Sequence, residues 1–143
     1  KSHAGKNVVI IGGNMIGCET AEFIAEYGKK VTILEMLSEI GQNMAIVPKP
    51  YTLSKLNKLG VEILTEAKVT AIEDDKVIYE RDGNKYTVEG VDTVVLAAGM
   101  ESVNELAEEL KSLDKPVHVV GDASNVSIIM EGLASVYDKL LGI

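Results

Sequence analysis

The stretch VVIIGGNMIGCETAEFIAEYGKKVTILEM, residues 8–36, decides the fold of this 143-residue chain. An apolar run ends in the turn GGNMIG, residues 12–17, and is followed by a helical pattern, a second apolar run and the carboxylate of Glu35. A glycine turn of this kind presents backbone N–H groups to a pyrophosphate at the positive end of a helix, and a carboxylate about 20 residues on accepts the ribose hydroxyls. Glu35 lies 18 residues after Gly17. The stretch therefore predicts a dinucleotide-binding βαβ unit.

Asn14 stands where the G-x-G-x-x-G pattern has its middle glycine. Asparagine adopts positive φ more readily than most residues, so the turn can still form, but the side chain occupies space through which a phosphate would approach the backbone. We expect weakened binding rather than none; the alternative is an ordinary strand-to-helix turn without a ligand. The helix that follows is expected to carry on one face Ile16, Thr20, Phe23, Ile24 and Tyr27.

The composition fits one globular unit, with 46% hydrophobic residues, 25% charged residues and a net charge of -8. Arg81 is the only arginine. Nucleic acids and anionic membranes need a concentrated cationic face, so neither is an expected partner. No apolar run approaches the roughly 20 residues that cross a bilayer, and no leader begins the chain, so a cytoplasmic location is expected.

Cys18 is the single cysteine, which excludes an internal disulfide and a multi-thiolate zinc site. It follows the glycine turn, where a helix N-terminus can lower the pKa of a thiol, but packing against the adjoining strand is the better interpretation. His3 and His118 have no partner at ligand spacing. We therefore expect no metal site, and we assign no catalytic acid, base or nucleophile.

The remaining chain predicts a Rossmann-like three-layer α/β fold, with a central parallel sheet and a three-stranded antiparallel meander as a crossover. Pro48 and Pro50 mark a loop, and a period of two between residues 68 and 88 predicts the meander. The expected strands are 8–11, 31–34, 61–64, 91–96 and 117–120, and the helices after the first one are 51–59, 104–110 and a terminal helix that begins near Ile129.

The order of these motifs resembles the pyridine-nucleotide-binding domain of flavoprotein reductases with two dinucleotide domains. Within that superfamily, residues 8–36 and DTVVLAAGMESVNELAEELK, residues 92–111, are most similar to the carboxyl-terminal region of 2-enoate reductase and 2,4-dienoyl-CoA reductase. These are NADH:flavin oxidoreductases of the old yellow enzyme type. The resemblance spans nearly the whole chain and implies a fragment that positions NADH for hydride transfer to FAD.

The resemblance also implies the site residues. Those assigned to the pyrophosphate are Gly12, Gly13, Asn14, Met15, Ile16 and Gly17. Glu19 matches a position near the nicotinamide, although a glutamate near a helix start is also stabilised by the helix dipole alone. Glu35 matches the position that binds the adenosine ribose, and Met36 and Val69 match positions at the adenine edge. Ala98 and Gly99, within the segment 97–99, match the turn beside the cofactor.

VHVVGDA, residues 117–123, is similar to the second flavin signature of the family, which assigns Asp122 to FAD. The alternative is that Asp122 caps the helix that follows. Residues 1–115 are thus expected to form the NAD(P)H-binding domain, and residues 116–143 a return segment that belongs to the FAD domain of a parent enzyme. FAD, FMN and an iron–sulfur cluster are expected in the parent only, and the isolated chain is expected to be inactive.

The expected partner is the remainder of that flavoenzyme, and the C-terminal segment is expected either to pack onto the nucleotide-binding core or to form a homodimer. NADH is favoured over NADPH, because residues 35–39 supply two carboxylates and no cation for a 2′-phosphate. Two alternatives stay open. One is a regulatory NAD-binding module in which no electrons flow, and the other is a scaffold domain with a decayed site.

Overall fold

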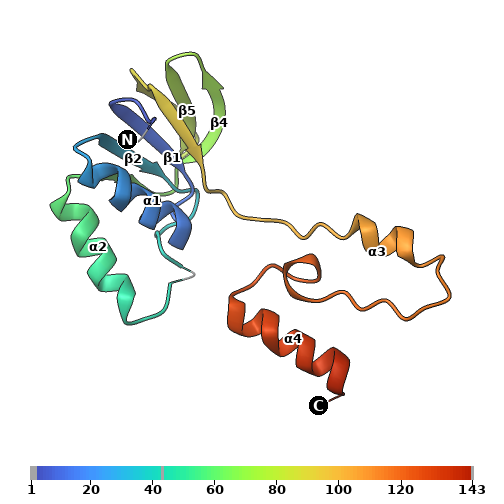
Figure 1. Cartoon of the computed structure of the whole chain (residues 1–143). Coiled ribbons are helices and arrows are strands. Elements are labelled where there is room, and N and C mark those ends of the chain that lie inside the picture. Colours follow the sequence, from blue (N-terminus) through green and yellow to red (C-terminus); the bar gives the residue numbers. More distant parts are fainter. Residues whose placement is uncertain (1–2, 43, 143) are drawn as a thin grey trace. The chain divides into compact units, whose positions relative to one another are not determined.

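A computed structural model describes residues 3–42 and 44–142. The chain divides into two compact units, Lys1–Gly99 and Met100–Ile143. The first unit holds β1 (Asn7–Ile11), α1 (Met15–Glu26), β2 (Lys30–Leu34), α2 (Pro48–Lys58), β3 (Glu62–Leu64), β4 (Lys68–Glu73), β5 (Lys76–Arg81), β6 (Asn84–Glu89) and β7 (Thr93–Leu96). The second holds α3 (Glu105–Leu110), the 3₁₀ turn η1 (Gly121–Ala123) and α4 (Ile129–Leu141) (Figure 1).

The parallel sheet of the first unit has the strand order β3-β2-β1-β7. Its register pairs Ile11 with both Leu34 and Leu96, and Leu34 with Leu64, so the carboxyl ends of all these strands meet at one edge. The antiparallel sheet β4-β5-β6 carries the chain from β3 to β7. The predicted fold, a Rossmann-like parallel sheet with a meander crossover, is confirmed. Ligands of such sheets bind at the carboxyl edge.

Two apolar cores lie on opposite faces of the parallel sheet, because successive residues of a strand point to opposite sides. Val8 and Ile10 of β1 pack with α1 and with Leu56 of α2, whereas Val9 packs with Val77 of β5. Figure 1 shows α1 and α2 on one side of the sheet and the meander on the other. This packing leaves the carboxyl edge as the place where a strand-to-helix turn can face a ligand.

The buried face of α1 differs from the expected one. The helix buries Gly17, Cys18, Ala21, Ile24 and Ala25. The larger side chains of Ile16, Phe23 and Tyr27 are 47%, 55% and 59% exposed. Small residues let the helix backbone approach the sheet closely, and this requirement outweighs the burial of bulkier side chains. Of the predicted face, only Ile24 belongs to the core.

Two other elements differ from the sequence prediction. α2 begins at Pro48, before the expected residue 51, because proline fits the first turn of a helix, where its missing N–H costs nothing. Residues 117–120 are not a strand. An extended segment needs a partner strand for its backbone groups, and the described residues of the second unit contain none. The predicted terminal helix is confirmed as α4.

The boundary between the units falls after Gly99, whereas the predicted domain boundary follows residue 115. The assignment of residues 116–143 to a flavin-binding half stays a prediction. Within residues 3–42 and 44–142, no helix has both the length and the apolar composition to span a membrane.

Candidate nucleotide site

At two positions of the glycine turn after β1, a side chain would overlap neighbouring backbone. Gly12 has φ +105, and a Cβ on it would overlap the carbonyl group of Ala97, which follows β7. A Cβ on Gly17 would overlap the carbonyl oxygen of Gly12. The first glycine therefore permits the tight turn beside β7, and the last permits α1 to pack against the turn.

Asn14 occupies the N-cap of α1 with φ -70, so the positive φ considered for it in the sequence is not used. Its side-chain oxygen accepts a hydrogen bond from Gly17 N at 3.0 Å, and its side-chain nitrogen donates to the carbonyl oxygen of Ala97 at 2.6 Å. Both polar atoms of the carboxamide are therefore bound to the chain's own backbone. The expectation that Asn14 weakens binding stays a prediction.

The backbone N–H groups of Asn14, Met15 and Ile16 have no acceptor among the described residues. They are the free donors that every α-helix leaves at its N-terminus. Met15 and Ile16 are 39% and 47% exposed, so this end of α1 reaches the surface. Free donors at the positive end of a helix attract an anion such as a pyrophosphate.

Glu35 follows β2 and turns its carboxylate toward the glycine turn. One carboxylate oxygen accepts from Gly13 N at 2.6 Å and the other from Leu37 N at 2.9 Å. The side chain is buried, with the residue 8% exposed. Each carboxylate oxygen has a second lone pair, so Glu35 can hold these backbone groups and still accept hydrogen bonds from hydroxyls.

A hollow of about 60 Å³ lies at this point and is lined by Gly13, Asn14, Glu35, Leu37, Glu39 and Gln42. It is far smaller than the 300–1,000 Å³ of typical ligand pockets, so a dinucleotide would lie mostly on an open surface. The loop after β2 forms one wall of the hollow. Gly41 N of this loop donates to the carbonyl oxygen of Gly13 at 2.6 Å and so holds the loop beside the glycine turn. Sequence reasoning missed Leu37 and Gln42 as lining residues, since a loop has no periodicity that points to them.

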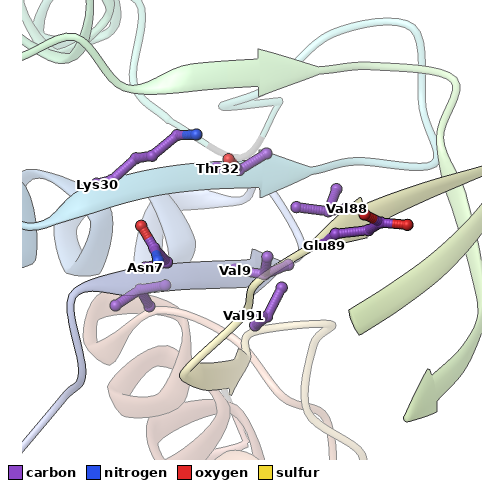
Figure 2. A pocket seen from close by; sticks show the side chains of 8 residues that line it. Asn7, Val9, Lys30, Thr32, Val88, Glu89 and Val91 are labelled. Atoms are coloured by element: carbon purple, nitrogen blue, oxygen red, sulfur yellow. The ribbon is translucent and has the colours of Figure 1, made fainter. Parts of the chain in front are cut away.

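A second hollow, of about 80 Å³, lies near the amino ends of β1 and β2. Figure 2 shows that its lining comes from these two strands and from the segment around Val88, Glu89 and Val91. No residue assigned to the cofactor lines it. This hollow lies toward the strand ends opposite Gly12 and Glu35, and it contributes nothing to the site.

The other predicted site residues fall in different surroundings. Glu19 is the fifth residue of α1 and is exposed, so it lies beyond the first turn where the helix dipole acts most strongly. Met36 is 65% exposed beside Glu35. Val69 is partly buried and packs against the core between the parallel sheet and the meander. Ala98 and Gly99 are exposed after β7. The structure thus brings Glu35 and the glycine turn together, and the assignments of Glu19, Met36, Val69, Ala98 and Gly99 to the cofactor stay predictions.

Asp122 belongs to the second unit. Its carboxylate accepts from Ser127 N at 3.2 Å. The N-cap of α4 is Ile128, which makes no side-chain capping bond. The alternative interpretation, in which Asp122 caps α4, is therefore wrong. The assignment of Asp122 to FAD stays a prediction.

Cys18 is fully buried and donates a hydrogen bond to the carbonyl oxygen of Gly13 at 3.4 Å. Burial, reinforced by the charges of Glu35 and Glu19, raises the pKa of the thiol from 9.0 to about 11. The packing interpretation of Cys18 is confirmed, because the side chain lies fully buried in the core between α1 and the sheet. The described part of the chain holds no cluster of histidine, cysteine and acidic residues that would bind a metal ion.

Comparisons with known proteins place the chain in a family. The family described as pyridine nucleotide-disulphide oxidoreductase matches residues 1–123. NADH oxidase of Thermoanaerobacter brockii is 39% identical over 131 residues, which cover 91% of this chain and 20% of that protein. Cinnamate reductase of Clostridium sporogenes is 30% identical over 148 residues, covering 96% of this chain and 21% of that protein.

Among solved structures, a 2-naphthoyl-CoA reductase bound to 2-naphthoyl-CoA superposes with a TM-score of 0.86 at 32% identity. The match covers 99% of this chain and 22% of that one. This chain therefore spans only about a fifth of the length of each of these relatives.

Proposed function

This chain belongs to the pyridine nucleotide-disulphide oxidoreductase family, and on that premise we propose that it binds NADH and positions it for hydride transfer to FAD in a larger flavoenzyme. It is the NAD(P)-binding region of a flavin oxidoreductase related to the enoate reductases. One observation carries the proposal. The carboxylate that follows β2 is bonded to the glycine turn that follows β1, at the carboxyl edge of a parallel sheet.

The two polar parts of this site match the two polar parts of a dinucleotide. The free N–H groups of Asn14, Met15 and Ile16 suit the pyrophosphate. The carboxylate of Glu35 suits the hydroxyls of the adenosine ribose. When bound, NADH supplies a hydride and FAD accepts it, while the residues of this chain bind and orient the donor.

The charges around the hollow favour NADH over NADPH. Glu35 and Glu39 both line it. Lys49 of α2 is near, but its ammonium pairs with the Glu39 carboxylate at 3.1 Å. A 2′-phosphate would thus meet two carboxylates and a cation that is already paired.

The similarity to cinnamate reductase and to 2-naphthoyl-CoA reductase supports a parent enzyme that reduces an unsaturated carboxylate or its CoA thioester. FMN and an iron–sulfur cluster would belong to parts of that enzyme outside this chain. Because the flavin that receives the hydride would also need those parts, the chain alone is expected to bind NADH without turnover.

Calorimetric titration tests the proposal. Glu35→Ala is expected to weaken NADH binding by about 1–3 kcal/mol, the order for a lost hydrogen bond to a charged group. Glu35→Ala also leaves Gly13 N and Leu37 N without an acceptor, so unfolding by urea must be followed in parallel. Wild-type protein is expected to bind NADH more tightly than NADPH.

Glu39→Gln is the matched control, because Glu39 lines the same hollow and makes no hydrogen bond to the glycine turn. It is expected to leave NADH affinity nearly unchanged. Equal NADH affinity with and without the Glu35 carboxylate would remove Glu35 from the site, and a wild-type protein that binds neither nucleotide would refute the proposal.

A further inference from the structure

We propose that Asn14 is a positioning residue that fixes the N-terminus of α1 for the pyrophosphate, an inference that rests on the proposed function. Its carboxamide oxygen holds Gly17 N at 3.0 Å, and its nitrogen holds the Ala97 carbonyl oxygen at 2.6 Å. One side chain therefore ties the first turn of α1 to the residue that follows β7. A carboxamide can do this because it offers an acceptor and a donor together.

The Ala97 peptide is a firm anchor for this tie. Ala97 N donates to the carbonyl oxygen of Ile11 at 2.8 Å, and Ala97 is 7% exposed. The same carbonyl group that accepts from Asn14 lies against Gly12. The Asn14 side chain thus connects α1 to a part of the sheet that is already fixed by β1 and β7.

The consequence concerns the donors that stay free. Asn14 caps only Gly17 N, and the N–H groups of Asn14, Met15 and Ile16 stay free for an anion. Their direction is set before a ligand arrives, and a preorganised site binds more tightly because less ordering accompanies binding. Asn14 is therefore a substitute for the middle glycine that supports the turn, and not a mark of a decayed site. This role of Asn14 reverses the sequence-based expectation that the residue weakens binding.

Other residues at this position would keep only part of the tie. Serine still caps α1 about as well as asparagine, but its single hydroxyl cannot also hold the Ala97 carbonyl. Glycine provides neither contact but lowers helix stability only slightly. Serine thus separates positioning from helix stability, and glycine tests whether the pattern's usual residue improves the site.

The experiment measures NADH affinity and urea unfolding of the full chain as wild type, Asn14→Ser and Asn14→Gly. Asn14→Ser is expected to bind NADH about 5- to 10-fold more weakly, as expected for the loss of one hydrogen bond, while its urea midpoint stays close to that of wild type. Asn14→Gly loses both contacts and is expected to bind NADH at least as weakly as Asn14→Ser. Nuclear magnetic resonance should show slow exchange of the Asn14 side-chain amide protons in the free protein.

Asn104→Gly is the matched control, because Asn104 is the N-cap of α3 and makes no side-chain capping bond. Asn104→Gly should leave NADH affinity unchanged. In the wild-type protein, the side-chain amide protons of Asn104 should exchange quickly. Unchanged or tighter NADH binding in the Asn14 variants overturns the inference alone. The inference is also overturned if the loss of NADH affinity in each Asn14 variant is proportional to its loss of stability in urea. Absence of NADH binding by wild type overturns the proposed function, and this inference with it.

Discussion

Cys18 shows at the scale of a single residue how burial and helix position compete. The thiol lies in the first turn of α1, where the helix dipole favours a thiolate. It is nevertheless enclosed in the core beside the buried Glu35, and its hydrogen reaches the carbonyl oxygen of Gly13. Desolvation is the largest effect and raises the pKa to about 11. The neutral thiol is therefore part of the packing under the glycine turn.

This shift predicts a loss of stability at alkaline pH. The folded pKa lies above the unfolded value of 9.0, so the thiol's contribution is complete below pH 9 and is lost as the pH rises toward about 11. Each unit of difference corresponds to about 1.4 kcal/mol. Urea unfolding should show wild type more stable than Cys18→Ala at pH 7.5, with the gap narrowing above pH 9. A gap that stays constant up to pH 10.5 would contradict the prediction.

At the scale of the element, α1 depends on a close approach to the turn that precedes it. Gly17 lies against the carbonyl oxygen of Gly12, which is backbone and cannot rotate away. On the other side, α1 is joined to α2 by Lys55, whose ammonium lies 2.6 Å from Glu22 and 2.7 Å from Glu26. The helix is thus held at its start by shape and along its exposed side by charge.

Gly17→Ala tests the contribution of shape. Alanine favours a helix by about 1 kcal/mol over glycine, but overpacking of a tight contact costs about 1–3 kcal/mol, and here the neighbour is backbone. We therefore expect net destabilisation and weaker NADH binding. Gly132→Ala in α4 is the control, because its nearest neighbour would be the Gly121 Cα at 3.8 Å, an ordinary contact. The midpoints of thermal unfolding of the two variants are compared with that of wild type. A Gly17→Ala protein as stable as wild type would show that the turn can shift.

The elements also show what could be predicted from the sequence. The alternation of strands and helices, the meander and the position of Glu35 follow from local patterns, and the structure confirms the fold they predict. The face that α1 buries could not be read from hydrophobicity, because the distance to the sheet selects small residues. The missing strand at residues 117–120 depends on a partner that no local pattern can supply.

At the scale of the whole molecule, the two units differ in how much they bury. Among the residues that the structure describes, the buried core side chains all belong to the first unit, the last of them being Ala97. Among the described residues of α3, η1 and α4, none is buried. Leu133, Tyr137 and Leu140 of α4 share one side of that helix and are 54%, 58% and 56% exposed. Burial of apolar surface is the main stabilising contribution to folding, so the first unit carries the stability.

A chain that ends at Gly99 should therefore unfold cooperatively at nearly the same urea concentration as the full chain, as followed by circular dichroism. A clearly lower midpoint would show that residues 100–143 pack onto the first unit, one of the two expectations for this segment. The other expectation is a homodimer formed through residues 100–143. Light scattering tests it, because the full chain would then be dimeric and the shorter chain monomeric.

Because the glycine turn and Glu35 lie in the first unit, the shorter chain should also bind NADH with the affinity of the full chain. A loss of binding without a loss of folding would place part of the cofactor site in the second unit.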